Sequence, residues 1–367
     1  MNYEEIQYQI ALLEVEGIGV KIARQLLDHF GSAKEIFNQP NKILQSLKTV
    51  GPQLISAKSS KGLFIDAEKE ITYCEKNKIQ ILSTSNNNYP RRLKQCADAP
   101  IILYYKGNGD LNHPKVISIV GTRAATSYGK EICNSIVKEL SAHNALIVSG
   151  LAYGIDVQAH NTSLNINLPT IGVLAHGLDR IYPREHTYIA NKMIEAGGIL
   201  TENRIGTNPA RENFPKRNRI VAGLSDATIV IESAIRGGSM ITANIANNYN
   251  RDVFAIPGRI GNKQSQGCNQ LIKINKAHLL ESAQDISYLL GWEMKMKKPK
   301  AMQKQIFPEL NPEEKTILAA LDDETNITID QIAVKANLPI SIVSTQLILL
   351  ECKGVIKQFP GKKYEVV

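Results

Sequence analysis

The chain reads Val116-Ile117-Ser118-Ile119-Val120-Gly121-Thr122-Arg123 near its middle, a β-branched run that ends in a glycine and a cation. Similar runs recur as far as about residue 290 and alternate with helical stretches, a pattern typical of an α/β fold with an extended Rossmann-like, mainly parallel sheet. Because the carboxyl ends of parallel strands share one edge, the turns after them should form a single ligand-binding edge. We expect strands at Val116–Val120, Ala145–Val148, Thr170–Leu174, Gly198–Leu200, Ala227–Ile231 and Asp252–Ile256.

Glycine and small polar residues follow each of these expected strands. Glycine lets the backbone approach a phosphate group closely, and Arg123 is able to hold one through two parallel hydrogen bonds. This composition predicts a phosphate-binding edge. The candidate contact residues from these turns are Gly121, Thr122, Arg123, Ser149, Gly150, Gly238 and Ser239.

A second basic segment, Phe214-Pro215-Lys216-Arg217-Asn218-Arg219, leads directly into an apolar run where a helix should begin. Free N–H groups and the dipole favour anions at a helix start, so cations there predict an anion site, with a solvated basic helix end as the alternative. Lys216 and Arg219 should share a helical face, whereas Arg217 points elsewhere and suits internal packing or pairing. Phe214 suits either stacking on a base or packing into the core. The candidates here are Phe214, Lys216, Arg217, Asn218 and Arg219.

The composition favours a polyanion as partner without requiring one. The 367 residues carry a formal net charge of +8 at pH 7, and an excess of basic residues is the electrostatic footprint of many nucleic-acid-binding proteins. Five cysteines without a Cys-x-x-Cys pair are typical of free thiols in a reducing cytoplasm. No apolar run approaches the roughly 18 residues of a membrane span, so we expect a cytoplasmic protein with no membrane contact.

The residues at the expected sheet edge do not match a nucleotide cofactor site. No Gly-x-Gly-x-x-Gly follows the first strand, and the second ends in Ser149-Gly150 instead of an acidic residue that would hold a ribose. Gly129-Lys130 lacks the preceding glycine and the following Ser or Thr of a Walker A loop. We therefore expect neither bound NAD nor ATP hydrolysis, and no cofactor.

Signals for catalysis or a metal are weak. Asp156 and His160 lie one helical turn apart, but no third ligand stands at a suitable spacing, so a hydrogen bond or surface pair is the better interpretation. His176 and Glu202 would be the acid–base candidates if the chain were an enzyme. We expect no catalytic residues and no metal.

The chain divides into four regions. Residues 1–80 have amphipathic helical spacing and contain Glu16-Gly17-Ile18-Gly19-Val20, which resembles a helix-hairpin-helix (SAM-like) motif, with a simple tight turn as the alternative. Residues 81–292 form the Rossmann-like domain and residues 293–308 a basic, proline-bearing linker. Residues 309–367 resemble a winged-helix module, whose expected recognition helix has no basic residue before Lys353. We therefore expect this module to contact a protein, or to bind a DNA duplex weakly.

Several motifs in the middle half of the chain together closely resemble the bacterial DNA-processing family DprA, also called Smf. His176, Thr201 and Gly237 depart from the usual residues of that family, but no basic or glycine position of the expected surface is lost. The motifs are Val120-Gly121-Thr122-Arg123, Ser149-Gly150-Leu151-Ala152-Tyr153-Gly154-Ile155-Asp156, Gly177-Leu178-Asp179 with Tyr182-Pro183, Phe214-Pro215-Lys216-Arg217-Asn218-Arg219-Ile220, and Gly238-Ser239-Met240-Ile241-Thr242.

This resemblance implies a single-stranded DNA-binding protein of natural transformation and recombination. Members of the family protect incoming strands, help load the RecA recombinase, usually act as homodimers and are not known for enzymatic turnover. Two other classes stay open. A phosphoribohydrolase-like, nucleotide-binding enzyme is suggested by Gly237-Gly238-Ser239, although the fuller Pro-Gly-Gly-x-Gly-Thr signature is missing. A structural adaptor, in which the terminal domains do the binding, is the other.

Overall fold

A nine-stranded sheet organises the larger part of the protein, in the order β1-β2-β6-β5-β4-β3-β7-β8-β9. The computed structural model describes residues 3–47, 50–292, 310–321, 327–359 and 363–366, which form two units, Met1–Met294 and Lys295–Val367. All strand pairs from β6 across to β9 are parallel, while β1 and β2 pair antiparallel with each other and β2 with β6. The expected Rossmann-like, mainly parallel sheet is confirmed. The expected linker at 293–308 lies outside the described residues.

Within the described part of this sheet, the six expected strands are all present, together with three strands that the sequence did not predict. The observed counterparts are β3 (Val116–Gly121), β4 (Leu146–Ser149), β5 (Thr170–Val173), β6 (Gly197–Thr201), β7 (Ala227–Ile231) and β8 (Asp252–Ala255). The additional strands are β1 (Gln80–Ser83), β2 (Ile102–Gly107) and β9 (His278–Leu279).

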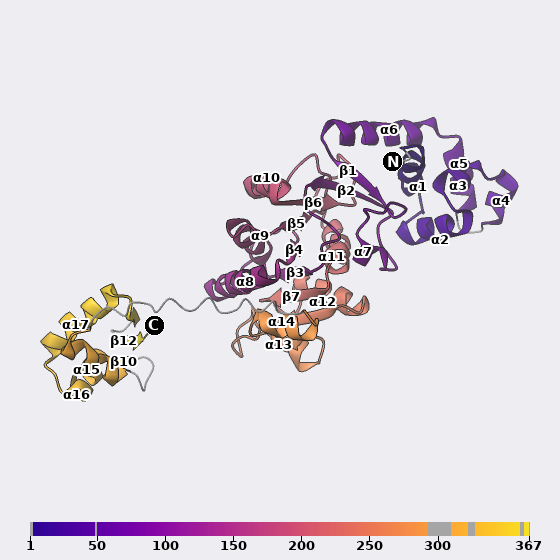
Figure 1. Ribbon diagram of the computed structural model, residues 1–367. Helices are drawn as coiled ribbons and strands as arrows, with labels where there is room; N and C mark the ends of the chain where they lie inside the picture. Colours follow the sequence, from indigo (N-terminus) through magenta and orange to yellow (C-terminus); the bar gives the residue numbers. More distant parts are fainter. Residues whose placement is uncertain (1–2, 48–49, 293–309, 322–326, 360–362, 367) are drawn as a thin grey trace. The chain divides into compact units, whose positions relative to one another are not determined.

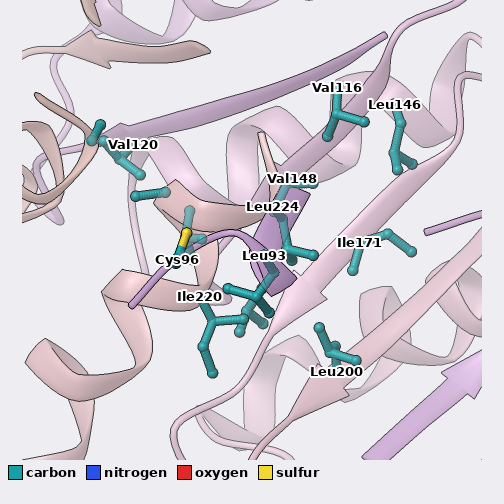
Figure 2. Close-up of a cluster of buried hydrophobic side chains, with 14 of the residues drawn as sticks. Leu93, Cys96, Val116, Val120, Leu146, Val148, Ile171, Leu200, Ile220 and Leu224 are labelled. Atoms are coloured by element: carbon teal, nitrogen blue, oxygen red, sulfur yellow. The ribbon is translucent and has the colours of Figure 1, made fainter. Parts of the chain in front are cut away.

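Helices cover both faces of the sheet (Figure 1). On one face, α8 and α9 pack with α14 over Ile117 and Ile119 of β3. On the other, the helices α7, α11, α12 and α13 pack over Val116 and Val120. Figure 2 shows Leu93 of α7 and Ile220 and Leu224 of α11 in this cluster. Neighbouring residues of β3 thus face opposite cores, as the alternation of side chains along a strand requires. The helices are α7 (Arg91–Lys94), α8 (Ser127–Leu140), α9 (Ile155–Asn165), α10 (Thr187–Ala196), α11 (Asn213–Leu224), α12 (Gly238–Asn248), α13 (Gln266–Lys273) and α14 (Ala283–Leu289).

The strand order reverses at β3. From β3 the chain proceeds outward through β4, β5 and β6, and it then returns to the other side of β3 as β7. Gly121, the last residue of β3, pairs with Ile231, the last residue of β7. Open α/β sheets bind ligands beyond the carboxyl ends of the strands at such a reversal. The loops after β3 and β7 are therefore the position at which this fold is expected to bind a ligand.

The N-terminal helices share a hydrophobic core with the edge of the sheet. Ile10 and Ile36 belong to the same buried cluster as Ile102 and Tyr104 of β2. Gly17 lies in the turn between α1 and α2 with a φ of 81°, in agreement with the expected tight hairpin. The boundary expected at residue 80 thus falls within one continuous core. These helices are α1 (Tyr3–Leu13), α2 (Val20–Phe30), α3 (Ala33–Asn38), α4 (Asn41–Ser46), α5 (Gly51–Lys58) and α6 (Lys61–Lys76).

The second unit has its own small core around Ile317, Ile332 and Leu347 and a sheet in the order β10-β12-β11. The three helices and the small sheet agree with the winged-helix module that residues 309–367 resemble. Among the described residues no single helix is long and apolar enough to cross a membrane, and α16 and α17 meet at a bend of 109°. The elements are α15 (Pro312–Leu321), β10 (Ile327–Thr328), α16 (Ile329–Ala336), α17 (Ile340–Cys352), β11 (Ile356–Phe359) and β12 (Lys363–Val366).

We expect Ile10→Ala to lower the free energy of unfolding of the helices and the sheet together, by about 2–5 kcal/mol, because it opens a cavity in their common core. The single tryptophan, Trp292, packs against the separate cluster around β3 and α8, so its fluorescence reports on the sheet. The urea midpoints of Trp292 fluorescence and of circular dichroism should both fall.

The matched control is Ile65→Ala, at an exposed position of α6, which should leave both midpoints unchanged. If Ile10→Ala leaves the Trp292 midpoint at its wild-type value, the helices unfold independently of the sheet.

Candidate nucleic-acid interface

The loop between β3 and α8 presents Arg123 to solvent. Gly121 has no room for a side chain, since a β-carbon there would lie 2.0 Å from the carbonyl oxygen of Ile231. Beyond it, Thr126 caps α8 by accepting a hydrogen bond from the amide of Gly129 at 3.2 Å. Arg123 is exposed between these fixed ends, and its guanidinium carbon lies 5.2 Å from the centre of the Phe214 ring. A guanidinium stacked in this way keeps its hydrogen-bond donors available for a phosphate.

The loop between β7 and α12 lies beside the β3–α8 loop. Gly237 precedes α12 without a side-chain cap, and a β-carbon on Gly238 would meet no atom within 4 Å. The first turn of this helix is therefore open to an approaching anion. The Ser239 hydroxyl instead donates a hydrogen bond to the Ser233 hydroxyl at 2.7 Å and is buried.

A cavity of about 340 Å³ joins the two loops with the start of α11. It places cationic, aromatic and glycine residues from three separate parts of the sequence around one space. The predicted residues that line it are Gly121, Thr122, Arg123, Phe214, Arg217, Asn218, Gly238 and Ser239.

Ser149, Gly150 and Arg217 form the buried support beneath this cavity. The Ser149 hydroxyl donates to the carbonyl of Ile119 at 2.6 Å, and the Arg217 guanidinium donates to the carbonyl of Val173. A β-carbon on Gly150 would lie 2.4 Å from Asp156 Oδ2 and 2.6 Å from both terminal nitrogens of Arg217, so this glycine leaves space for two buried charges. Burial raises the pKa of Asp156, and Arg217 opposes that rise. Arg217 thus points inward, as expected, and direct contact of the three residues with a ligand stays a prediction.

Lys216 and Arg219 face a different cavity, of about 720 Å³, which reaches Lys21 of α2. The shared helical face of these two cations is confirmed, but their surroundings differ. Lys216 is exposed and has no ion-pair partner among the described residues. Arg219 forms an ion pair with Glu202 and donates to the carbonyl of Asp98. Burial raises the pKa of Glu202, and Arg219 counteracts it. Arg219 therefore already has an internal partner, which the sequence pattern did not indicate.

The histidines considered for chemistry serve internal bonds. His160 Nδ1 lies 2.7 Å from the Thr170 hydroxyl and Nε2 lies 2.6 Å from the Gly150 carbonyl. Burial lowers the pKa of His160 to about 4, so the ring is neutral at pH 7. His176 Nδ1 donates to the carbonyl of Gly177, and burial lowers the pKa of this ring as well. Within the described ranges, no three His, Cys, Asp or Glu side chains are placed to hold a metal ion.

The structure adds an aromatic neighbour that sequence reasoning did not assign a role. The Tyr182 ring is 46% exposed and lies 6.2 Å from the Phe214 ring, centre to centre. Together with Tyr153 and Arg123 they border a hollow of about 30 Å³. In the sequence Tyr182-Pro183 is only part of a motif, and the distance between Tyr182 and Phe214 along the chain does not indicate that their rings meet. Exposed rings beside cations are the composition of surfaces that bind single-stranded nucleic acid.

Comparisons with known proteins identify the family of the chain. Residues 80–291 match the family model for DNA recombination-mediator protein A, and residues 301–362 match the DprA winged helix domain. The Synechocystis protein Smf is 32% identical over an alignment of 397 residues that covers 100% of both chains.

Two solved structures of DprA are also similar. That from Streptococcus pneumoniae has a TM-score of 0.63 at 31% identity and covers 78% of this chain and 97% of its own. That from Helicobacter pylori has a TM-score of 0.53 at 31% identity and covers 58% and 95%. The resemblance found from the motifs is confirmed, and so is the winged-helix identity of the second unit. The chain belongs to the DprA/Smf family of DNA-processing proteins.

Proposed function

We propose that this protein binds single-stranded DNA at the carboxyl edge of β3 and β7. The observation that carries the proposal is the exposed Arg123, stacked on Phe214 across one cavity from the open first turn of α12. The Helicobacter pylori relative is described as binding single-stranded DNA, which supports the same ligand here. DNA is thus the polyanion that the basic composition favours.

The mechanism of binding is recognition of the DNA backbone with aromatic support. Arg123 and Lys216 supply positive charge, and the amides at the start of α12 supply neutral donors for phosphate oxygens. Phe214 and Tyr182 offer ring faces on which successive bases stack, whatever their identity. None of these contacts reads the edge of a base, so binding should depend on salt far more than on sequence.

The family relationship supports a role for this binding in the processing of DNA during transformation. We propose further that the protein protects incoming strands, helps to load RecA and acts as a homodimer. These roles are expected of the family rather than derived from the site. They require that the DNA stay bound without being cut, which agrees with a site built for positioning rather than for proton transfer.

A nucleotide-binding enzyme is the second candidate, favoured by the glycine-rich start of α12. Incubation with nucleoside monophosphates, followed by chromatography for the free base, distinguishes it from the first. We expect no base release, and no heat of binding for ATP or NAD in calorimetry, because the two phosphate-binding fingerprints are missing from the sequence. Base release, or saturable micromolar binding of either cofactor, would favour the enzyme.

Arg123→Ala and Lys216→Ala should each weaken the binding of a fluorescent oligo-dT by about tenfold at moderate salt, since each removes one charge-assisted phosphate contact. Each should also flatten the slope of log affinity against log salt by about 0.7. Both side chains are exposed, so circular dichroism melting should not change. Fluorescence anisotropy over a salt series measures both quantities.

Two further variants serve as controls. Lys76→Ala, at an exposed position on α6 away from either cavity, should leave affinity and slope unchanged. Arg219→Ala should lower the melting temperature, because it leaves the partly buried Glu202 without its ion-pair partner. Wild-type affinity in both Arg123→Ala and Lys216→Ala would refute the proposed surface.

A further inference from the structure

Glu232, the first residue after β7, has a backbone conformation that is rare for its type. Its φ is 53°, in the left-handed region, and its side chain is only 3% exposed. A residue with a β-carbon holds this conformation only where its surroundings enforce it, and such residues concentrate at functional sites. Neither the formation of β7 nor the binding of a phosphate at the neighbouring turns requires a buried carboxylate at this position.

Three hydrogen bonds join Glu232 to the loop that carries Arg123. Its carbonyl oxygen accepts a hydrogen bond from the amide of Thr122 at 2.8 Å. Its carboxylate accepts one from the amide of Thr126 at 2.9 Å and a second from the Thr126 hydroxyl at 2.5 Å. Glu232 therefore binds the residue directly before Arg123 and the residue that caps α8.

The fit around the carboxylate is close. A β-carbon on Gly129, in the first turn of α8, would lie 2.3 Å from Glu232 Oε2. The negative charge thus lies against the positive end of α8, where the helix dipole and the N–H donor stabilise it. Because both oxygens are occupied or covered, the carboxylate supports the loop without presenting its charge to an approaching phosphate.

The next residue, Ser233, fixes the other half of the cavity in the same way. Its hydroxyl accepts the hydrogen bond from Ser239 in α12 at 2.7 Å, and its carbonyl accepts one from the amide of Gly267 at 2.7 Å. Two successive residues at the end of β7 thus hold the loop of Arg123 and the open start of α12. The distance between the loop of Arg123 and the start of α12 is therefore determined by Glu232 and Ser233.

We infer that Glu232 is a positioning residue for DNA binding, which acts by holding the β3–α8 loop so that Arg123 meets a phosphate in a single geometry. This inference rests on the proposed function and goes beyond it, since Glu232 itself does not contact the DNA. Preorganisation of this kind contributes to affinity because the loop has less freedom to lose on binding.

The test is a double-mutant cycle on the full-length protein with fluorescent oligo-dT as the probe. Glu232→Gln keeps the shape of the side chain but removes its charge and one acceptor, so affinity should fall by about fivefold. In the Arg123→Ala background the same change should alter affinity by less than about twofold, because the contact it supports is gone. In the Lys216→Ala background the full loss should persist, since Lys216 lies on α11.

Thr126→Val provides a second route if Glu232→Gln lowers the melting temperature. It removes the hydroxyl that bonds to Glu232 and caps α8, but it keeps the amide bond. It should show the same dependence on Arg123, whereas Thr126→Ser, which keeps both bonds of the hydroxyl, should bind as the wild type does. An equal loss in the Arg123→Ala and Lys216→Ala backgrounds, or no loss at all, would overturn the role of Glu232. If Arg123→Ala itself binds like the wild type, the proposed function fails instead.

Discussion

The contact between the ends of β3 and β7 is the constraint on which the site depends. Gly121 lies so close to the carbonyl oxygen of Ile231 that no side chain fits between the two strands. Both strands can therefore end at the same level, and the loops that leave them start side by side. One loop carries the exposed Arg123, and the other leads through Glu232 and Ser233 to the uncapped start of α12. The cavity between them follows from strand packing rather than from the loops alone.

The cations at the start of α11 are divided between two tasks. Among the described residues Lys216 has no ion-pair partner, whereas Arg219 forms an ion pair with the partly buried Glu202. Arg217 donates to the carbonyl of Val173 and lies near the buried Asp156, which favours its charged form. Buried ion pairs contribute little net stability compared with apolar packing, but the loss of one partner is costly. Their role here is to fix the direction of α11. The helix thereby keeps Phe214 under Arg123 and Lys216 at the surface.

The sequence predicted the central strands and the sheet edge well, because β-branched runs that end in glycine are a local signal. The strands β1 and β2 were not predicted, because their place in the sheet depends on contacts with α1 to α6. The strand β9 has only two residues, which is too short for a sequence pattern. The different surroundings of Lys216 and Arg219 could not be predicted from the sequence either. Helical spacing shows which face a residue occupies, but it does not show whether a carboxylate such as Glu202 lies opposite that face. The left-handed backbone conformation of Glu232 could not be predicted, because a glutamate gives no indication of a positive φ. The family itself was recognisable from motifs that the fold brings to one edge.

The central claim, that DNA lies across the carboxyl edge of β3 and β7, is tested most directly by photo-cross-linking. Full-length protein would be irradiated with an oligo-dT that contains 4-thiothymidine, and the cross-linked peptides would be identified by mass spectrometry. We predict cross-links to Phe214 and Tyr182, within the reach of bases whose phosphates contact Arg123. Cross-links confined to α1–α6 or to residues 310–366, with none at residues 121–126, 182 or 213–219, would contradict the account.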